Sequence, residues 1–303
     1  MKLTRIVSLM LVALLTACLV GCGETTVYED HAKLSRVVDY VYQSVDEDTL
    51  TAAESMWLVK ESGKPLGDGE TEYSTALATA MDGELSSSQA IYATWAAISY
   101  GTVDQGILDL WNDTTFVIGD YPNIYSYCYY LTTLNMLVDR GYTMELTDEL
   151  VEAMLPLKDQ YDSFGYSTGS DAIDIDTTAV TVSALMPYYS DAEVKAVVDA
   201  CLMKLATLVN DNGSYTSWGA ESICSTAQIV LMQVQADYYG VETGIDVTES
   251  IEWLESKILD EGTFDASGDP GFNARQGAEA LISYYSFAKD GTTIFTKTIS
   301  VDE

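Results

Sequence analysis

The stretch "AIYATWAAISYG", residues 90–101, contains the pattern that decides the fold. Its apolar residues recur three and four positions apart, which is the spacing of a buried helical face, and a glycine ends the run. Five other segments end in a similar way, and the chain has no sustained apolar and polar alternation of the kind that strands show. The six endings are Gly63, Gly101, Gly141, Tyr189, Gly240 and Gly291. The pattern therefore predicts an all-α protein.

The six endings also recur at a regular distance. They are spaced 38, 40, 48, 51 and 51 residues apart. A repeated unit of this length with two helical stretches is one helical hairpin. Six hairpins can close a ring in which one helix of each pair lines the inside and the other faces outward. We therefore expect an (α/α)6 toroid.

The last three units share a turn sequence that combines a polar residue, a glycine and an aromatic residue. The three turns are "DSFGY" at 162–166, "NGSYT" at 212–216 and "EGTFD" at 261–265. We expect each turn to join the two helices of a pair. Each is followed by a polar loop and a segment rich in small residues, which allow neighbouring helices to approach closely.

The N-terminus predicts export. Lys2 and Arg5 precede a short apolar run that ends in "LVGCG", residues 19–23, and this order is typical of a secretory signal. The ending resembles the lipobox of bacterial lipoproteins, so Cys22 is the expected lipidated residue, with Cys18 as the alternative. We expect a signal peptide at 1–21, a lipidated tether at 22–27, the toroid at 28–292 and a C-terminal tail at 293–303. The protein would then lie outside the cell membrane, anchored to it by the lipid.

The charge of the chain excludes several classes of partner. The net charge is −33, and removal of a signal that carries two of the 14 Lys and Arg and none of the 47 Asp and Glu takes it to −35. Such a protein does not bind nucleic acid through phosphate contacts, which rely on basic patches. Electrostatic docking on anionic lipid is disfavoured for the same reason.

The cysteines and the single histidine limit the chemistry. Cys128 and Cys201 stand in apolar segments, and with Cys224 they are odd in number, which favours buried thiols over a disulfide framework. His31 is the only histidine. A zinc site of the usual Cys and His type and a Ser-His-Asp site are therefore disfavoured, and no cofactor is expected. Two oxygen-rich loops, at 210–213 and 265–271, lack the spacing of an EF-hand and are interpreted as solvated turns.

A family resemblance covers nearly all of the exported chain, about residues 28–292. The segments "DGELSSSQAIYATWAAISYG" and "PGFNARQGAEALISYYSF" resemble the α/α toroid superfamily, which holds terpenoid cyclases, protein prenyltransferase β subunits and cobalamin carriers. The resemblance implies the ring fold, and through the cobalamin carriers it makes corrinoids a candidate ligand. Prenyltransferases bind zinc with a histidine that has no counterpart in the matching segments of this chain. The matching motifs are patterns of small and aromatic residues, so they specify the fold better than the function.

The acidic pair in "DAIDIDTTAVTVSAL", residues 171–185, has two interpretations. By resemblance to the DxDD or DxDT motif of class II terpene cyclases, Asp176 would donate a proton and Asp174 would be its neighbour, although Thr177 replaces the last aspartate. By repeat register, Asp176, Ser225 and Asn273 lie 49 and 48 residues apart, each before a small-residue helix. Serine, asparagine and aspartate are favoured N-caps, and Ser225 and Asn273 each have a glutamine three residues on, as in a capping box. We therefore expect Asp176 to cap a helix.

Ligand contacts are expected at the mouth of the ring, in the loops ahead of the inner helices. Trp218, in the loop "SYTSWGAES", is the first candidate, with Asp171, Asp174 and Asn273 in loops of the same rim. Twenty-one tyrosines add either packing or an aromatic lining for a flat or sugar-like ligand. The leading hypothesis is a non-catalytic binding module for a small molecule, a corrinoid among the candidates, or for a surface protein. The alternative is a terpenoid-cyclase or glycan-cleaving enzyme that uses Asp174 and Asp176.

Overall fold

A computed structural model describes residues 25–43, 49–65, 87–119, 123–165 and 173–296. Within these ranges the regular secondary structure is helical except for one short hairpin, and turns and loops join the elements. The all-α class predicted from the sequence is confirmed. No helix in these ranges is both long and apolar enough to cross a membrane.

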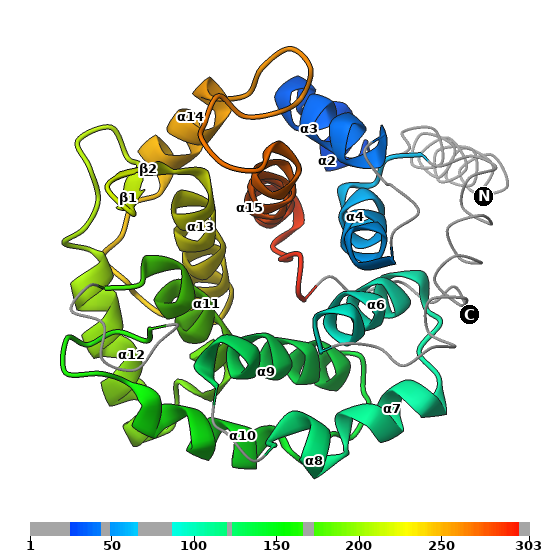
Figure 1. The fold of residues 1–303 in the computed structure, drawn as a ribbon, viewed down its shortest axis with the longest axis vertical. Helices are drawn as coiled ribbons and strands as arrows, with labels where there is room; N and C mark the ends of the chain where they lie inside the picture. Colours follow the sequence, from blue (N-terminus) through cyan, green and yellow to red (C-terminus); the bar gives the residue numbers. More distant parts are fainter. Residues whose placement is uncertain (1–24, 44–48, 66–86, 120–122, 166–172, 297–303) are drawn as a thin grey trace, which may run out of the picture.

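Among the described helices, six form an inner ring in which each contacts the next (Figure 1). The last of them packs against the first, which closes the ring. The inner helices are α4 (Thr49–Ser62), α6 (Ser87–Tyr100), α9 (Ile124–Asp139), α11 (Ile175–Leu185), α13 (Ile223–Tyr238) and α15 (Pro270–Asp290). The ring is the arrangement that the hairpin repeat predicts, and its assignment to the (α/α)6 toroid superfamily stays a prediction.

The remaining helices lie outside the inner ring (Figure 1). Two of them have only four residues, and two 3-10 turns continue α10 and α11. The outer elements are α2 (Val27–Asp30), α3 (Ala32–Gln43), α7 (Gln105–Trp111), α8 (Thr114–Val117), α10 (Thr147–Met154) with η1 (Leu155–Leu157), α12 (Ala192–Leu205) and α14 (Thr248–Ser256), while η2 (Met186–Tyr188) follows α11. The hairpin strands β1 (Tyr215–Ser217) and β2 (Ala220–Ser222) lead into α13.

Neighbouring inner helices meet at recurring sequence separations, 38 residues early in the ring and 48 or 49 later in it. The hydrogen-bonded pairs are Glu61 with Ser99 and Trp95 with Thr133, each 38 residues apart, Asn135 with Ala184 and Cys224 with Asn273, each 49 apart, and Gln228 with Gln276, 48 apart. A separation that stays nearly constant along one helix pair, as between α13 and α15, is expected when the two helices run parallel. We call the end at which the inner helices begin the mouth, and the end at which they finish the anchor face.

The predicted helix endings agree with the structure to within a few residues. Gly63, Gly101 and Gly291 each directly follow the last residue of an inner helix, and each has a positive φ. Glycine populates this left-handed conformation without steric cost, which is why it ends helices. The α11 ending is different, because Pro187 directs the chain into a 3-10 turn after Leu185.

The three similar turns also share one conformation. A backbone N–H bonds the carbonyl four residues on, from Asp159 to Ser163 at 2.9 Å, from Asn210 to Ser214 at 2.9 Å and from Leu259 to Thr263 at 2.8 Å. Asp162, Gly213 and Gly262 occupy the same place in these turns, with φ of 57°, 79° and 88°. The aromatic residues that follow, Phe164, Tyr215 and Phe264, are buried. The repeated turns are thus anchor points between the outer layer and the inner ring.

The centre of the ring is filled with side chains. After Gly291 the chain turns into the ring, where Phe295 packs on Trp57 and Trp95 with ring centroids 5.9 Å and 5.5 Å apart. Residues 293–296, which the sequence placed in a tail, are therefore part of the core. The cavity left between Trp95, Tyr129 and Phe295 measures about 10 Å³, roughly enough for one water molecule.

Substitution of Gly262 tests the shared turn. A Cβ at Gly262 would lie 2.1 Å from the Arg36 carbonyl oxygen at a φ of +88°. We expect Gly262→Ala to lower the free energy of unfolding by about 3 kcal/mol or more, because clash and strain add. Gly219→Ala, at a φ of +81° with open space around it, is the control and should cost only about 1 kcal/mol. Equal losses in urea unfolding would contradict the account of the turn.

Candidate functional site

Side chains cap the three inner helices nearest the candidate residues. Asp174 accepts a hydrogen bond from the Thr177 N–H at 3.0 Å, Ser222 from the Ser225 N–H at 3.1 Å and Asp269 from the Phe272 N–H at 2.6 Å. These N-caps satisfy N–H groups that have no partner within the helix.

The expected capping roles of Asp176, Ser225 and Asn273 are therefore wrong. Each of these residues lies inside the helix, two to four positions after the true cap. Several favoured cap residues follow one another at each site, and the position of the preceding turn selects the first of them. The predicted register of 48 residues between Ser225 and Asn273 is found three positions further along, where Gln228 of α13 donates to Gln276 of α15.

Asp176 therefore does not cap α11, which is the role that the sequence suggested for it. Its carboxyl lies in the first turn of α11, and burial raises its pKa, with the charge of Asp174 adding to the effect. The Ser225 hydroxyl lowers that pKa, but neither Asp176 Oδ1 nor Ser225 Oγ completes a hydrogen bond of ordinary geometry with any described residue. An underbonded, shielded carboxyl of this kind favours its neutral form more than a solvated aspartate does.

The other sequence candidates have different surroundings. Asn273 is buried, and its amide nitrogen donates to the Ser267 carbonyl at 3.2 Å. Burial raises the pKa of the neighbouring Cys224 thiol to about 12, so it is protonated at neutral pH and is no nucleophile. Cys128 and Cys201 are buried free thiols, as expected. Asp171, Cys18 and Cys22 lie outside the described residues.

Trp218 lies at the tip of the β1–β2 hairpin, which the sequence did not distinguish from a loop. Ser217 pairs with Ala220, so Trp218 and Gly219 form a two-residue turn. Both have a positive φ, 53° and 81°, in a turn that prefers Asn-Gly. A bulky residue in this conformation costs about 1–2 kcal/mol. The indole is nevertheless fully exposed, at 103% of its reference area.

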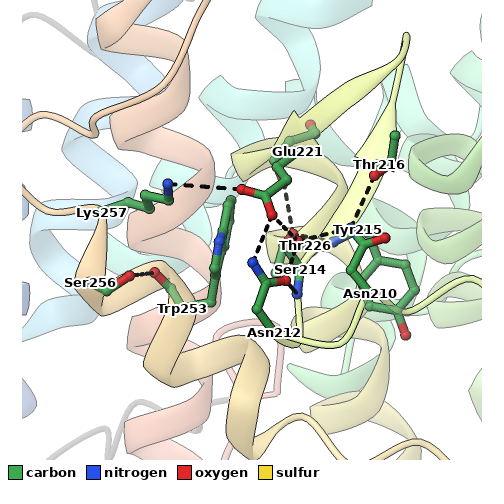
Figure 2. A network of polar contacts seen from close by, with 11 residues as sticks. Asn210, Asn212, Ser214, Tyr215, Thr216, Glu221, Thr226, Trp253, Ser256 and Lys257 are labelled. Atoms are coloured by element: carbon green, nitrogen blue, oxygen red, sulfur yellow. Dashed lines mark hydrogen bonds and ion pairs between the residues drawn. The ribbon is translucent and has the colours of Figure 1, made fainter.

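A network of polar contacts braces the hairpin from below (Figure 2). Glu221 of β2 accepts hydrogen bonds from the Asn212 amide at 2.7 Å and the Ser214 hydroxyl at 3.2 Å. Lys257 approaches the same carboxylate at 3.9 Å from the segment after α14 (Figure 2). The Tyr215 N–H donates to Thr226 Oγ1 of α13 at 3.0 Å, which ties the hairpin to the inner ring.

Other exposed aromatic rings lie close to the starts of inner helices. Tyr125 is in the first turn of α9 and Phe272 in the first turn of α15, and 44% and 43% of their reference areas are exposed. With Trp218 ahead of α13, they place three large apolar side chains at the mouth. Aromatic side chains combine large contact area with little conformational entropy, and they are enriched at binding sites.

Below the mouth lies a buried charged group that the sequence reasoning missed. Arg275 Nε donates to Glu54 Oε2 at 2.6 Å, and Gln276 donates to Glu279 at 3.5 Å. Burial raises the pKa of Glu54 to about 6, against the opposing effect of Arg275. Burial and the Glu54 charge raise the pKa of Glu279 well above its usual range. The sequence feature that could have revealed these buried acids is the single acid Glu279 within a segment rich in small residues, "RQGAEAL".

No group of three or more His, Cys, Asp or Glu side chains within the described ranges is arranged to hold a metal ion. The sequence matches no protein-family model, and a search of curated proteins finds no significant match.

Two aspartate substitutions test the assignment of the cap. We expect Asp174→Ala to lower the free energy of unfolding by about 1 kcal/mol, because the Thr177 N–H loses its partner. Asp176→Asn should be neutral or stabilising, because the amide avoids the cost of ionising a shielded carboxyl that caps nothing. The reverse order of the two effects in chemical unfolding would restore Asp176 as the cap.

The buried glutamates predict a stability that falls as the pH rises. Their folded pKa lies above the unfolded value, so their contribution is complete below pH 4.5 and, for Glu54, is lost as the pH passes about 6. For Glu54 the difference corresponds to about 2 kcal/mol. We expect Glu279→Gln to reduce the loss of unfolding free energy between pH 5 and pH 7.5.

The control for this measurement is Glu145→Gln, which removes one exposed acid and changes the net charge equally. It corrects for the general repulsion in a protein with a net charge of −33. An identical pH dependence of the unfolding free energy in the two variants would show that Glu279 contributes no more to it than an exposed acid does.

Proposed function

We propose that the protein is a lipid-anchored, extracytoplasmic binding module that takes its ligand at the mouth of the ring, with Trp218 as the principal contact. The observation that carries this proposal is a fully exposed indole on a backbone of positive φ, held on a braced hairpin. Folding gains nothing from exposing this ring or from the strain beneath it. Strain at a supported surface position is expected where function requires it.

The filled interior supports a ligand at the surface. A remaining space of about 10 Å³ in the centre excludes a corrinoid or a sugar from the ring, whereas the loops and first turns at the mouth carry exposed aromatic rings. The net charge of −33 favours a neutral or cationic ligand over an anionic one. Neutral oligosaccharides, corrinoids bound by one face and a surface protein are the candidates, and no cofactor is needed.

One observation favours the enzyme as a second candidate. Asp176 is not a helix cap, and it is half-buried with its Oδ1 shielded from solvent, which raises the pKa of the carboxyl. In a terpenoid-cyclase or glycan-cleaving enzyme Asp176 would be the proton donor, with Asp174 holding the helix start beside it. This candidate requires that Asp176→Asn abolish turnover of a substrate while the protein remains folded.

Trp218 provides an intrinsic probe of the proposed site. The other four tryptophans, Trp57, Trp95, Trp111 and Trp253, are buried. Acrylamide is uncharged and is not repelled by an acidic protein, so it should quench one exposed emission component that is missing in Trp218→Phe. A ligand bound at the mouth should protect the Trp218 emission from quenching. Native mass spectrometry with neutral oligosaccharides, isoprenoids and corrinoids identifies the class of ligand to use in this experiment.

Affinity measurements then test the contact itself. We expect Trp218→Ala to weaken binding at least tenfold, which corresponds to about 1.4 kcal/mol or more. Met203→Ala is the matched control, because Met203 is an exposed apolar side chain on the outer helix α12. This variant should bind the ligand with the same affinity as the unchanged protein. Equal affinities for all three proteins would remove Trp218 from the site.

A further inference from the structure

The N-terminal segment joins the ring at the face opposite the mouth. Lys289, in the last turn of α15, donates to the Thr25 carbonyl and pairs with Asp30 at 3.0 Å. Gly63, which follows α4, packs so closely on Thr26 that a Cβ there would lie 2.6 Å from the Thr26 Cβ. Both contacts are made where inner helices finish, so the chain enters at the anchor face.

The tether from this point to the expected lipid is short. Cys22 precedes Thr25 by three residues, and three extended residues span about 10 Å. The inner helix α15, with 21 residues, separates the anchor face from the mouth by about 30 Å. A lipid on Cys22 therefore reaches a bilayer beside the anchor face and cannot reach one placed against the mouth.

Charge does not distinguish the two ends of the ring. Asp174 and Asp269 cap α11 and α15 at the mouth, and Asp139 and Asp290 are the last residues of α9 and α15 at the anchor face. The orientation of the ring at a bilayer is therefore determined by where the tether leaves it.

We propose that the anchor face rests on the surface of a phospholipid bilayer and that the mouth, with Trp218, points away from it. The inference rests on the lipid at Cys22, which is part of the proposed function. It places Trp218 about one inner-helix length above the membrane. The ligand then approaches from the medium and belongs to a soluble molecule or to a second surface, and it is not a lipid of the same bilayer.

The native thiols make a site-specific test practical. Burial raises the pKa of Cys128, Cys201 and Cys224 to about 12, so these thiols should resist maleimide labelling at neutral pH. Thr143→Cys places a dye on an exposed residue just beyond α9, at the anchor face, and Trp218→Cys places one at the mouth. Both variants are made in the full-length, lipidated protein.

The labelled proteins are reconstituted into phosphatidylcholine vesicles that contain a headgroup-linked nitroxide lipid, a short-range quencher. We expect quenching at position 143 to be several-fold stronger than at position 218. Equal quenching, or stronger quenching at 218, overturns the orientation. A lipidated protein that does not float with the vesicles overturns it as well, and Cys22→Ser, which removes the lipid, defines that unbound signal. No ligand is used, so a failure of ligand binding at Trp218 would leave the result unaffected.

Discussion

The buried ion pair between Glu54 and Arg275 closes the ring. It joins the first inner helix, α4, to the last, α15, across 221 residues of sequence, with 2.6 Å between the paired atoms. Three more ion pairs join the N-terminal helices α2 and α3 to the last part of the chain, from α14 to α15; we call this boundary the seam. They are formed by Lys33 with Glu255, Arg36 with Asp260, and Asp30 with Lys289. The exposed pairs contribute little each, whereas removing one partner of the buried pair would leave an uncompensated charge in the core. The seam is thus where the ring depends on charge.

Closure of the ring determines where a ligand can bind. The C-terminal segment enters from the anchor face and fills the centre with Phe295, packed between Trp57 and Trp95. Binding surface is then left at the ends of the inner helices. At the mouth, helix caps, the braced hairpin and exposed aromatic rings meet, and Trp218 is held in a conformation that its side chain disfavours. In the function that we propose, the ring is a rigid support for a contact surface at its edge.

The sequence predicted the features that depend on local pattern. The helical period, the glycine endings and the repeated turns at 162, 213 and 262 follow from the conformational preferences of single residues, and the structure contains them. The caps were misplaced because Asp174 and Asp176, or Ser222 and Ser225, are equally good N-caps and only the adjoining turn chooses between them. Sequence spacing cannot supply the partner of Glu54, which lies 221 residues away. It also cannot reveal the positive φ of Trp218.

Glu54 and Arg275 are expected to hold the closed ring together as a pair, and a double-mutant cycle at pH 7.5 measures this coupling. The free energy of unfolding would be measured for Glu54→Gln, Arg275→Gln and the double variant. Glu54→Gln should cost about 3–5 kcal/mol, because the Arg275 charge stays buried without its partner. Arg275→Gln should cost less, because Glu54, whose pKa is already about 6 beside Arg275, can then take up a proton. The double variant should cost less than the sum by about 2 kcal/mol or more, since it removes both charges. Additive losses would contradict the account and would show that the ring closes through apolar packing alone.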